Sequence, residues 1–268
     1  MTQSPDLPPS PKPPAPERST AVLVLGMHRS GTSALTRILN LLGVELGGSL
    51  MRAAAGNNST GFWEHQDLVD LHDELLEHVG SRWDDPRPLD PDRLLADDTR
   101  PIRDRMLAVV QRDFSDQPLW GLKDPRLCRL LPVWKELLDR AGCDVRYVLT
   151  ARHPAEVAAS LERRDGFPAA LSHLLWMEHC LAAERETRGA KRVFVTYDDL
   201  MADWRGTAAR IGAGTGCDWE ARLDEVAPQV AEFLNPELRH HRTTALDGLH
   251  VWIRAVWSIW REATQGGD

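Results

Sequence analysis

Residues 26–33 combine glycines, hydroxyl residues and a cation in a single turn, which is the composition of an anion-binding loop. They read Gly-Met-His-Arg-Ser-Gly-Thr-Ser, follow the apolar run 21–25 and precede a stretch with helical periodicity. A strand, a glycine turn and a helix start form a phosphate cradle, where backbone N–H groups and the helix dipole stabilise the anion. The glycines have the spacing of an ATP-binding loop, but Thr32 stands where that motif has lysine, and the cation is Arg29. We therefore expect a phosphate-bearing ligand other than ordinary ATP.

Charged or polar residues also follow three later apolar runs, which are residues 118–122, 145–150 and 192–196. The first run leads into Lys123, which opens the turn Lys-Asp-Pro-Arg. The second leads into Arg152, with Ser160 eight positions later, and the third leads into Tyr197, which opens Tyr-Asp-Asp. Ligands of parallel α/β sheets bind at the carboxyl ends of the strands. We therefore expect these side chains to line one crevice together with the glycine loop.

The elements that must position these residues follow from the apolar runs and the helical periodicity. The four apolar runs predict strands, and helices are predicted at 33–42, 66–78, 98–113, 132–141, 154–164, 169–187, 203–211 and 249–263. Pro132 and Pro154 suit first-turn positions of two of these helices. Apolar strands that alternate with helices indicate an α/β fold with three α/β/α layers around a central parallel sheet.

The composition argues against several classes of protein. A formal net charge of -8 makes nucleic acid an unexpected partner. The four cysteines have neither a CxxC pair nor regular spacing, so neither a zinc site nor a disulfide framework is predicted. Without a signal-peptide pattern or a window long enough for a membrane span, we expect a cytoplasmic protein. Prolines crowd residues 1–19, which we expect to be a disordered tail before one domain over 20–268.

The residues around the glycine loop resemble those of PAPS-dependent sulfotransferases, whose donor is 3′-phosphoadenosine 5′-phosphosulfate (PAPS) and whose product is the bisphosphate PAP. Residues 24–33 resemble the 5′-phosphosulfate-binding loop of that family. Arg152 and Ser160 match its 3′-phosphate pair, and the Lys-Asp-Pro of residues 123–125 resembles a motif of the tyrosylprotein branch. The chain departs from the family in lacking the C-terminal Arg-Lys-Gly-x-x-Gly segment, for which residues 238–242 are the candidate replacement.

The resemblance implies roles for the matching residues. The expected donor-binding residues are His28 (where the family has proline), Arg29, Ser30, Gly31, Thr32, Ser33, Arg152, Ser160, Tyr197 and Arg242. The expected catalytic residues are Arg29, Lys123, Glu64 and His65. Arg29 and Lys123 would stabilise the transferring sulfuryl group, which carries less charge than a terminal phosphate, so no metal is expected. Glu64 is preferred to His65 as the base, since the apolar side chains beside it raise its pKa.

Structural interpretations of the same residues remain open. Glu64 is also suited to capping the helix that follows it. The Lys-Asp-Pro-Arg turn would equally serve as a surface turn with an internal ion pair, and Tyr197 as packing at a strand end. His65, His72 and His78 lack metal-ligand spacing on one helix face, and we expect them to be solvated or capping.

The acceptor is expected to be a small molecule with a hydroxyl group, such as a natural product. Two other functions remain open. One is an ATP-dependent small-molecule kinase, for which Asp198 after the fourth strand is the supporting residue. The other is a nucleotide-binding module without catalysis.

The last predicted helix, residues 249–263, carries apolar residues at helical spacing: Leu249, Trp252, Val256, Ile259 and Trp260. This pattern predicts packing against the sheet. The alternatives are a subunit interface, in a possible homodimer, or a membrane-surface face.

Overall fold

Four parallel strands form the central sheet, in the order β2-β1-β3-β4. They are β1 (Thr20–Leu25), β2 (Leu119–Lys123), β3 (Asp144–Ala151) and β4 (Arg192–Thr196). The computed structural model describes residues 18–52, 61–234, 243 and 245–266. All four strands lie where apolar runs predicted them. Because the chain leaves β1 for β2 on one side and returns to β3 on the other, the loop after β1 lies at the topological switch point, where ligands of such sheets bind.

The helices also follow the predicted alternation, with several changes of boundary. They are α1 (Thr32–Leu41), α2 (Gln66–His78), α3 (Pro91–Leu94), η1 (Asp97–Thr99), α4 (Arg100–Phe114), α5 (Leu127–Arg140), α6 (Pro154–Asp165), α7 (Ala169–Glu186), α8 (Tyr197–Ala202), α9 (Trp204–Thr215), η2 (Glu220–Arg222), α10 (Ala227–Phe233) and α11 (Val251–Ala263). Pro154 occupies the first turn of α6, as predicted. The prediction for Pro132 was wrong, because α5 begins at Leu127 and contains Pro132 in its interior. Full burial of Leu127 and Leu131 outweighs the backbone hydrogen bond that proline removes.

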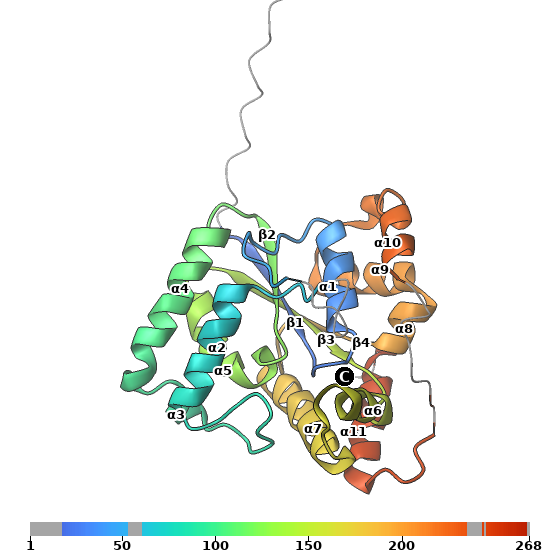
Figure 1. Ribbon diagram of the computed structural model, residues 1–268. Coiled ribbons are helices and arrows are strands. Elements are labelled where there is room, and N and C mark those ends of the chain that lie inside the picture. Colours follow the sequence, from blue (N-terminus) through green and yellow to red (C-terminus); the bar gives the residue numbers. More distant parts are fainter. Residues whose placement is uncertain (1–17, 53–60, 235–242, 244, 267–268) are drawn as a thin grey trace, which may run out of the picture.

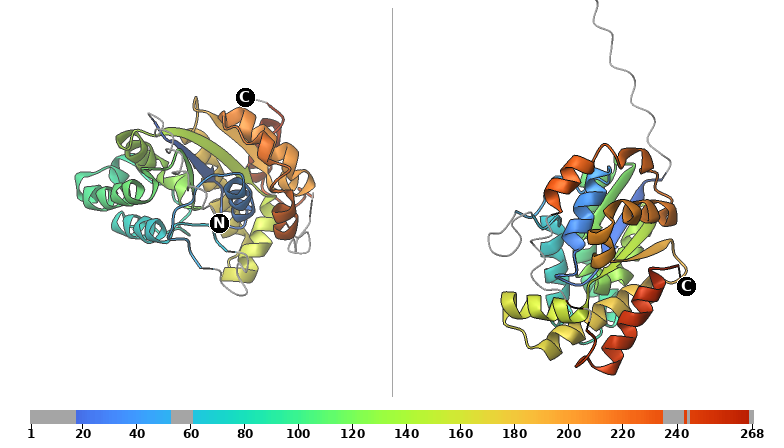
Figure 2. Two further views of the ribbon diagram at one scale, coloured as in Figure 1. Left: turned by 90° about the horizontal axis from the view of Figure 1, so that it is seen from above. Right: turned by 90° about the vertical axis from the view of Figure 1, so that its right-hand side faces the viewer.

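The sheet is covered on both faces, which confirms the three-layer α/β/α prediction (Figures 1 and 2). Side chains alternate along β1, so Leu23 and Leu25 pack into the core beneath α4, α5 and α7. Val22 and Val24 pack into the opposite core, with side chains of α1 and α9. Both cores therefore meet at β1, which fixes the position of the loop that follows it.

Helix α11 packs against α7 and β4, which confirms the prediction that it packs against the sheet. Of the predicted residues, Trp260 is buried and Leu249 and Val256 pack against the core, whereas Trp252 is 66% exposed and Ile259 is 63% exposed. The prediction was wrong for these two because apolar residues lie on both sides of this helix, and periodicity alone does not say which side meets the sheet. Trp260 adds a specific anchor, since its Nε1 donates a hydrogen bond to the Val195 carbonyl oxygen at 3.2 Å.

The chain enters the sheet through Arg18 and Ser19. Trp120 Nε1 donates to Ser19 Oγ at 3.3 Å, and the Ser19 carbonyl accepts from the Asp144 backbone. Residues 1–17 of the predicted tail lie outside the described residues. All four cysteines are free thiols, and three of them are buried. Among the described residues, no helix is long and apolar enough to cross a membrane.

Candidate active site

The loop after β1 places the N-terminus of α1 at the carboxyl edge of the sheet. Gly31 is the N-cap of α1 and has a left-handed backbone with φ of 82°; Arg29 is also left-handed, with φ of 67°. A Cβ on Gly31 would lie 2.2 Å from Cδ2 of Tyr197, so only glycine allows this approach. Thr32 opens the helix and is buried, as is Ser30, whose Oγ has no hydrogen-bond partner among the described residues. The loop thus places the N-terminus of α1 and a buried hydroxyl together after β1.

His28, the departure from the family pattern, faces the segment after α2. Its ring meets the edge of Trp83 with centroids 4.6 Å apart, and its Nε2 has no hydrogen-bond partner within the described ranges. Burial, together with the charge of Arg164, holds the pKa of His28 well below its ordinary value. His28 is therefore a neutral imidazole at neutral pH.

Arg29 and Ser160 lie in direct contact, although they were predicted to hold opposite ends of the nucleotide. Arg29 Nε donates to Ser160 Oγ at 2.7 Å, which joins the loop after β1 to α6. The sequence placed these residues in one crevice but gave no sign of this bond, because 131 positions separate them.

Arg152, at the end of β3, is held between a carboxylate and an aromatic ring. Its Nε donates to Glu156 Oε2 at 2.7 Å, and its guanidinium lies over the Tyr197 ring, 5.0 Å from the centroid. Glu156 is fully buried, and its other oxygen accepts from the Thr243 backbone at 2.9 Å. Tyr197 therefore contacts both Arg152 and Gly31. Sequence reasoning missed Glu156, which the i,i+4 spacing from Arg152 would have indicated.

Lys123 and Glu64 form a buried ion pair at the end of β2. The Lys123 ammonium contacts Glu64 Oε1 and donates to Ser33 Oγ at 3.3 Å. Only 1% of the Lys123 side chain and 7% of the Glu64 side chain are exposed. Burial raises the pKa of Glu64 above its ordinary value of 4.5, although the charge of Lys123 opposes this. The capping interpretation of Glu64 is wrong, because His65 is the N-cap residue of α2 and Glu64 faces Lys123 instead.

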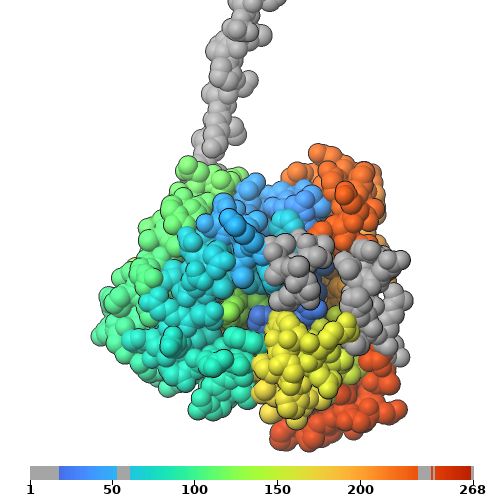
Figure 3. Space-filling view, viewed as in Figure 1, coloured from blue at the N-terminus to red at the C-terminus, as the bar shows by residue number. Residues whose placement is uncertain are grey.

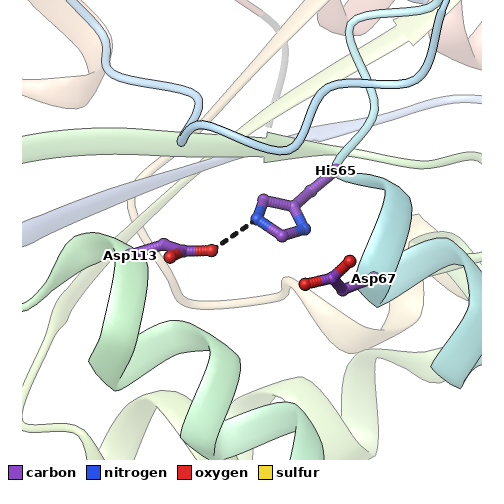
Figure 4. A group of neighbouring side chains, drawn as sticks. All are labelled: His65, Asp67 and Asp113. Carbon is purple, nitrogen blue, oxygen red and sulfur yellow. Dashed lines mark hydrogen bonds and ion pairs between the residues drawn. The ribbon is translucent and has the colours of Figure 1, made fainter.

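Glu64 and His65 face opposite ways, because the segment that carries them is extended. The Glu64 carbonyl accepts from the Met51 backbone at 2.8 Å, and His65 pairs with Leu50 in an antiparallel bridge. Successive side chains of an extended segment alternate. His65 consequently contacts Asp113 at the end of α4, with Nε2 and Oδ2 2.7 Å apart (Figure 4). Glu64 is thus on the side of Lys123, and His65 is not.

The turn after Lys123 is a buried anchor rather than a surface turn, although it does contain the ion pair that the surface interpretation expected. Asp124 accepts from the backbone and Nη1 of Arg126 at 2.9 and 3.0 Å, and lies 2.7 Å from His72 Nδ1. Burial alone would raise the pKa of Asp124, but Arg126 and His72 hold it well below its ordinary value. Trp134 Nε1 donates to His72 Nε2 at 2.9 Å, so the proton of the neutral His72 ring is on Nδ1.

The prediction of solvated or capping histidines was wrong for His72, whereas His65 stands at the N-cap position of α2 without a capping hydrogen bond from its side chain. His65 and His72 are buried, and each contacts an aspartate. His78 lies at the surface beside Asp98, as expected. Apolar residues lie on both sides of α2, so the sequence pattern does not show which side, with its histidines, is buried.

Figure 3 shows a hollow at the centre of this molecular face, bordered by cyan residues and by the yellow residues around α6 and α7. Blue atoms from the N-terminal part of the chain lie at its base. Residues 53–60, and residues 238–242 with the predicted donor-binding Arg242, lie outside the described residues. Asp199 of the Tyr-Asp-Asp turn caps α8, since it exchanges two hydrogen bonds with Thr196.

Comparison with known proteins gives a family for this geometry. The model of the Sulfotransferase family matches residues 21–221. Among solved structures, the chain is similar to the sulfotransferase domain of the olefin synthase from Synechococcus PCC 7002, at 19% identity and a TM-score of 0.55, over 92% of this chain and 97% of that one. It is also similar to the sulfotransferase domain from the curacin biosynthetic pathway, at 14% identity and a TM-score of 0.52, over 91% of this chain and 98% of that one.

The two structures share the fold with this chain. No curated protein sequence matches the chain. The family model, by contrast, spans well over half of the sequence and includes all four strands and the glycine loop. The chain therefore belongs to the sulfotransferase family.

Proposed function

We propose that this sulfotransferase moves the sulfuryl group of PAPS to the hydroxyl of a small-molecule acceptor, such as a natural product, without a metal. The main support is that Arg29, Lys123 and Arg152 follow three adjacent strands and surround the N-terminus of α1. The family generally uses PAPS. A bisphosphorylated donor needs cations at two separate places, one for the 5′-phosphosulfate and one for the 3′-phosphate. This arrangement supplies Arg29 and Lys123 at the first place and Arg152 at the second.

The residues of the first place suit the 5′-phosphosulfate. In the proposal, the N–H groups of residues 31–33 and the hydroxyls of Ser30 and Thr32 bind phosphate oxygens, as helix N-termini do in other phosphate sites. Ser30 supports this assignment because its buried Oγ has no hydrogen-bond partner within the described chain.

The residues of the second place suit the 3′-phosphate and the adenine. Arg152 lies over the Tyr197 ring, and its Nε donates to Glu156. In the proposal, the Arg152 guanidinium binds the 3′-phosphate with Ser160, and the Tyr197 ring contacts the base. Glu156 positions the guanidinium and neutralises part of its charge.

Transfer requires one proton acceptor and two groups that stabilise developing charge. The acceptor oxygen forms the new S–O bond, the bond from sulfur to the phosphate oxygen breaks, and PAP leaves. Glu64 takes the hydroxyl proton, for which its raised pKa suits it. Arg29 and Lys123 stabilise the charge on the leaving oxygen. Each must first leave its present partner, Ser160 and Glu64 respectively.

The decisive experiment compares the thermal shifts produced by PAP, AMP and ATP, each with Mg²⁺ and with a chelator. The proposal expects PAP to stabilise the chain most, independently of Mg²⁺, and expects Arg152→Ala to weaken PAP binding far more than AMP binding. Stabilisation by ATP that requires Mg²⁺ would instead indicate the kinase. Equal losses of PAP and AMP affinity in Arg152→Ala would remove this residue from 3′-phosphate recognition.

Transfer itself is measured with sulfur-labelled PAPS and a library of phenols, sugars and aliphatic alcohols. Labelled product with any acceptor supports the enzyme. If the wild type gave no labelled product with any acceptor, and donor binding survived loss of both Lys123 and Glu64, the chain would be a binding module. The cytoplasmic location and the possible homodimer stay predictions.

A further inference from the structure

A second cluster of polar side chains lies on the side of the 64–66 segment that faces away from Lys123. His65 precedes α2, Asp67 lies in the first turn of α2, and Asp113 is near the end of α4. One potential ligand atom from each lies within 4.8 Å of the others (Figure 4). Carboxylates gather on many protein surfaces without a ligand, so the buried histidine is the part of this cluster that needs an explanation.

The two nitrogens of His65 have different surroundings. Nε2 lies 2.7 Å from Asp113 Oδ2, whereas the buried Nδ1 has no hydrogen-bond partner among the residues that the structure describes. The His65 side chain is 1% exposed, so water does not reach this nitrogen freely. Figure 4 shows it on the side of the ring that faces Asp67. A buried polar atom without a partner costs free energy, which a bound ligand would recover.

The hydrogen bond to Asp113 determines which nitrogen is available. Arg112 donates to both oxygens of Asp113, from Nε at 2.8 Å and from Nη2 at 2.7 Å, so this carboxylate acts as an acceptor. In the neutral ring the proton is therefore on Nε2, and the lone pair is on Nδ1. Metal-binding histidines are oriented in this way, with one nitrogen donating to a carboxylate while the other binds the metal.

We propose that His65 Nδ1 and the Asp67 carboxylate, with Asp113 orienting the ring, bind a divalent transition metal of the Zn²⁺ type, water completing its coordination. An imidazole nitrogen beside carboxylate oxygens suits Zn²⁺, whereas Mg²⁺ and Ca²⁺ prefer oxygen ligands alone. This site is separate from the proposed transfer chemistry, for which we expect no metal, and does not depend on the identity of the donor.

Arg112 competes with the metal for the same carboxylates. Its Nη2 donates to Asp67 at 2.6 Å and to Asp113 at 2.7 Å, so a guanidinium takes the place of a cation between them. The Arg112 side chain is 55% exposed and is free to turn toward solvent when a metal displaces it. Removal of Arg112 should therefore strengthen metal binding, because it removes both a competitor and a like charge.

The test is Zn²⁺ titration by calorimetry on the full chain without an affinity tag, with the visible absorption of bound Co²⁺ as a second readout. We expect Arg112→Gln to bind one Zn²⁺ at least about tenfold more tightly than the wild type. The reason is that repulsion between the Arg112 charge and the metal is worth about 1.4 kcal/mol or more at this range, which corresponds to tenfold in affinity. Adding Asp67→Asn to Arg112→Gln should weaken binding by at least about tenfold. Both side chains are partly exposed, so these variants are expected to fold, which circular dichroism checks.

The matched control is His78→Ala. His78 contacts Asp98 at 3.2 Å, and Arg93 contacts the same aspartate at 2.6 Å, so this exposed trio resembles the cluster without its buried nitrogen. His78→Ala should bind Zn²⁺ as the wild type does. Affinity unchanged by Arg112→Gln, Zn²⁺ bound equally well after Asp67→Asn, or no one-to-one binding to the Arg112→Gln chain would each overturn the proposal.

Discussion

Replacement of Glu64 by glutamine separates its role as a base from its role in stabilising the fold. The change keeps the shape and one acceptor oxygen for Lys123 but removes the negative charge. We expect turnover to be lost, because a neutral amide does not take the acceptor proton. We expect PAP affinity to be nearly unchanged, since the proposed donor contacts do not include Glu64.

The same change should cost considerable stability. The Lys123 side chain is only 1% exposed and has Glu64 as its close counter-ion. In the variant its buried charge would lose that counter-ion. Removing one partner of a buried pair costs about 3–5 kcal/mol. Because glutamine retains an oxygen and Ser33 Oγ remains 3.3 Å from the ammonium, we expect about 3 kcal/mol, at the lower end of that range.

A double-mutant cycle with Lys123→Met isolates the pair. Urea unfolding followed by circular dichroism gives the free energy of unfolding of each variant. The double variant removes both buried charges, and we expect it to unfold within about 1 kcal/mol of the wild type. If Glu64→Gln were as stable as the wild type and turned over normally, the buried pair and the base assignment would both be wrong.

The pH dependence of the wild type gives an independent check on Glu64. Burial raises the pKa of Glu64 above 4.5, so the active carboxylate forms only as the pH rises through this raised pKa. The acidic limb of the kcat profile should therefore have its midpoint above pH 4.5. The acidic limb of kcat should persist in active variants that keep Glu64. Its loss in such a variant would contradict the assignment of the limb to Glu64.

Three further substitutions probe the loop and its support. Arg29→Ala should lower turnover by about 10²–10³-fold in initial-rate assays, and a normal kcat would exclude Arg29 from the transfer step. Gly31→Ala should lower the free energy of unfolding by about 1–3 kcal/mol and weaken PAP binding, because the new Cβ would lie 2.2 Å from Tyr197 at a φ of 82°. An unchanged melting temperature would refute this. Asp124→Asn should cost about 3 kcal/mol in urea unfolding, since it leaves Arg126 without a buried counter-ion, and an unchanged midpoint would count against that anchor.

The fold and the place of the site could be predicted from local patterns. The apolar runs identified every strand, because a parallel strand buried on both faces is continuously apolar. The composition of the 26–33 loop predicted an anion-binding helix N-terminus, and α1 does begin at Thr32 in this loop. Parallel strands bring their carboxyl ends to one edge, so the polar residues after each strand were expected in one crevice, and Lys123, Arg152 and Tyr197 do end their strands there.

Other decisions depend on contacts between distant segments. Glu64 and His65 are adjacent candidates for the catalytic base. Pairing of their segment with residues 49–51 decides which of the two faces Lys123. The buried partners of Asp124, the bond between Arg29 and Ser160 and the buried face of α11 have the same origin. Local periodicity shows which residues share a side of an element. Which side is buried, and which polar atoms meet there, depends on how the elements pack together.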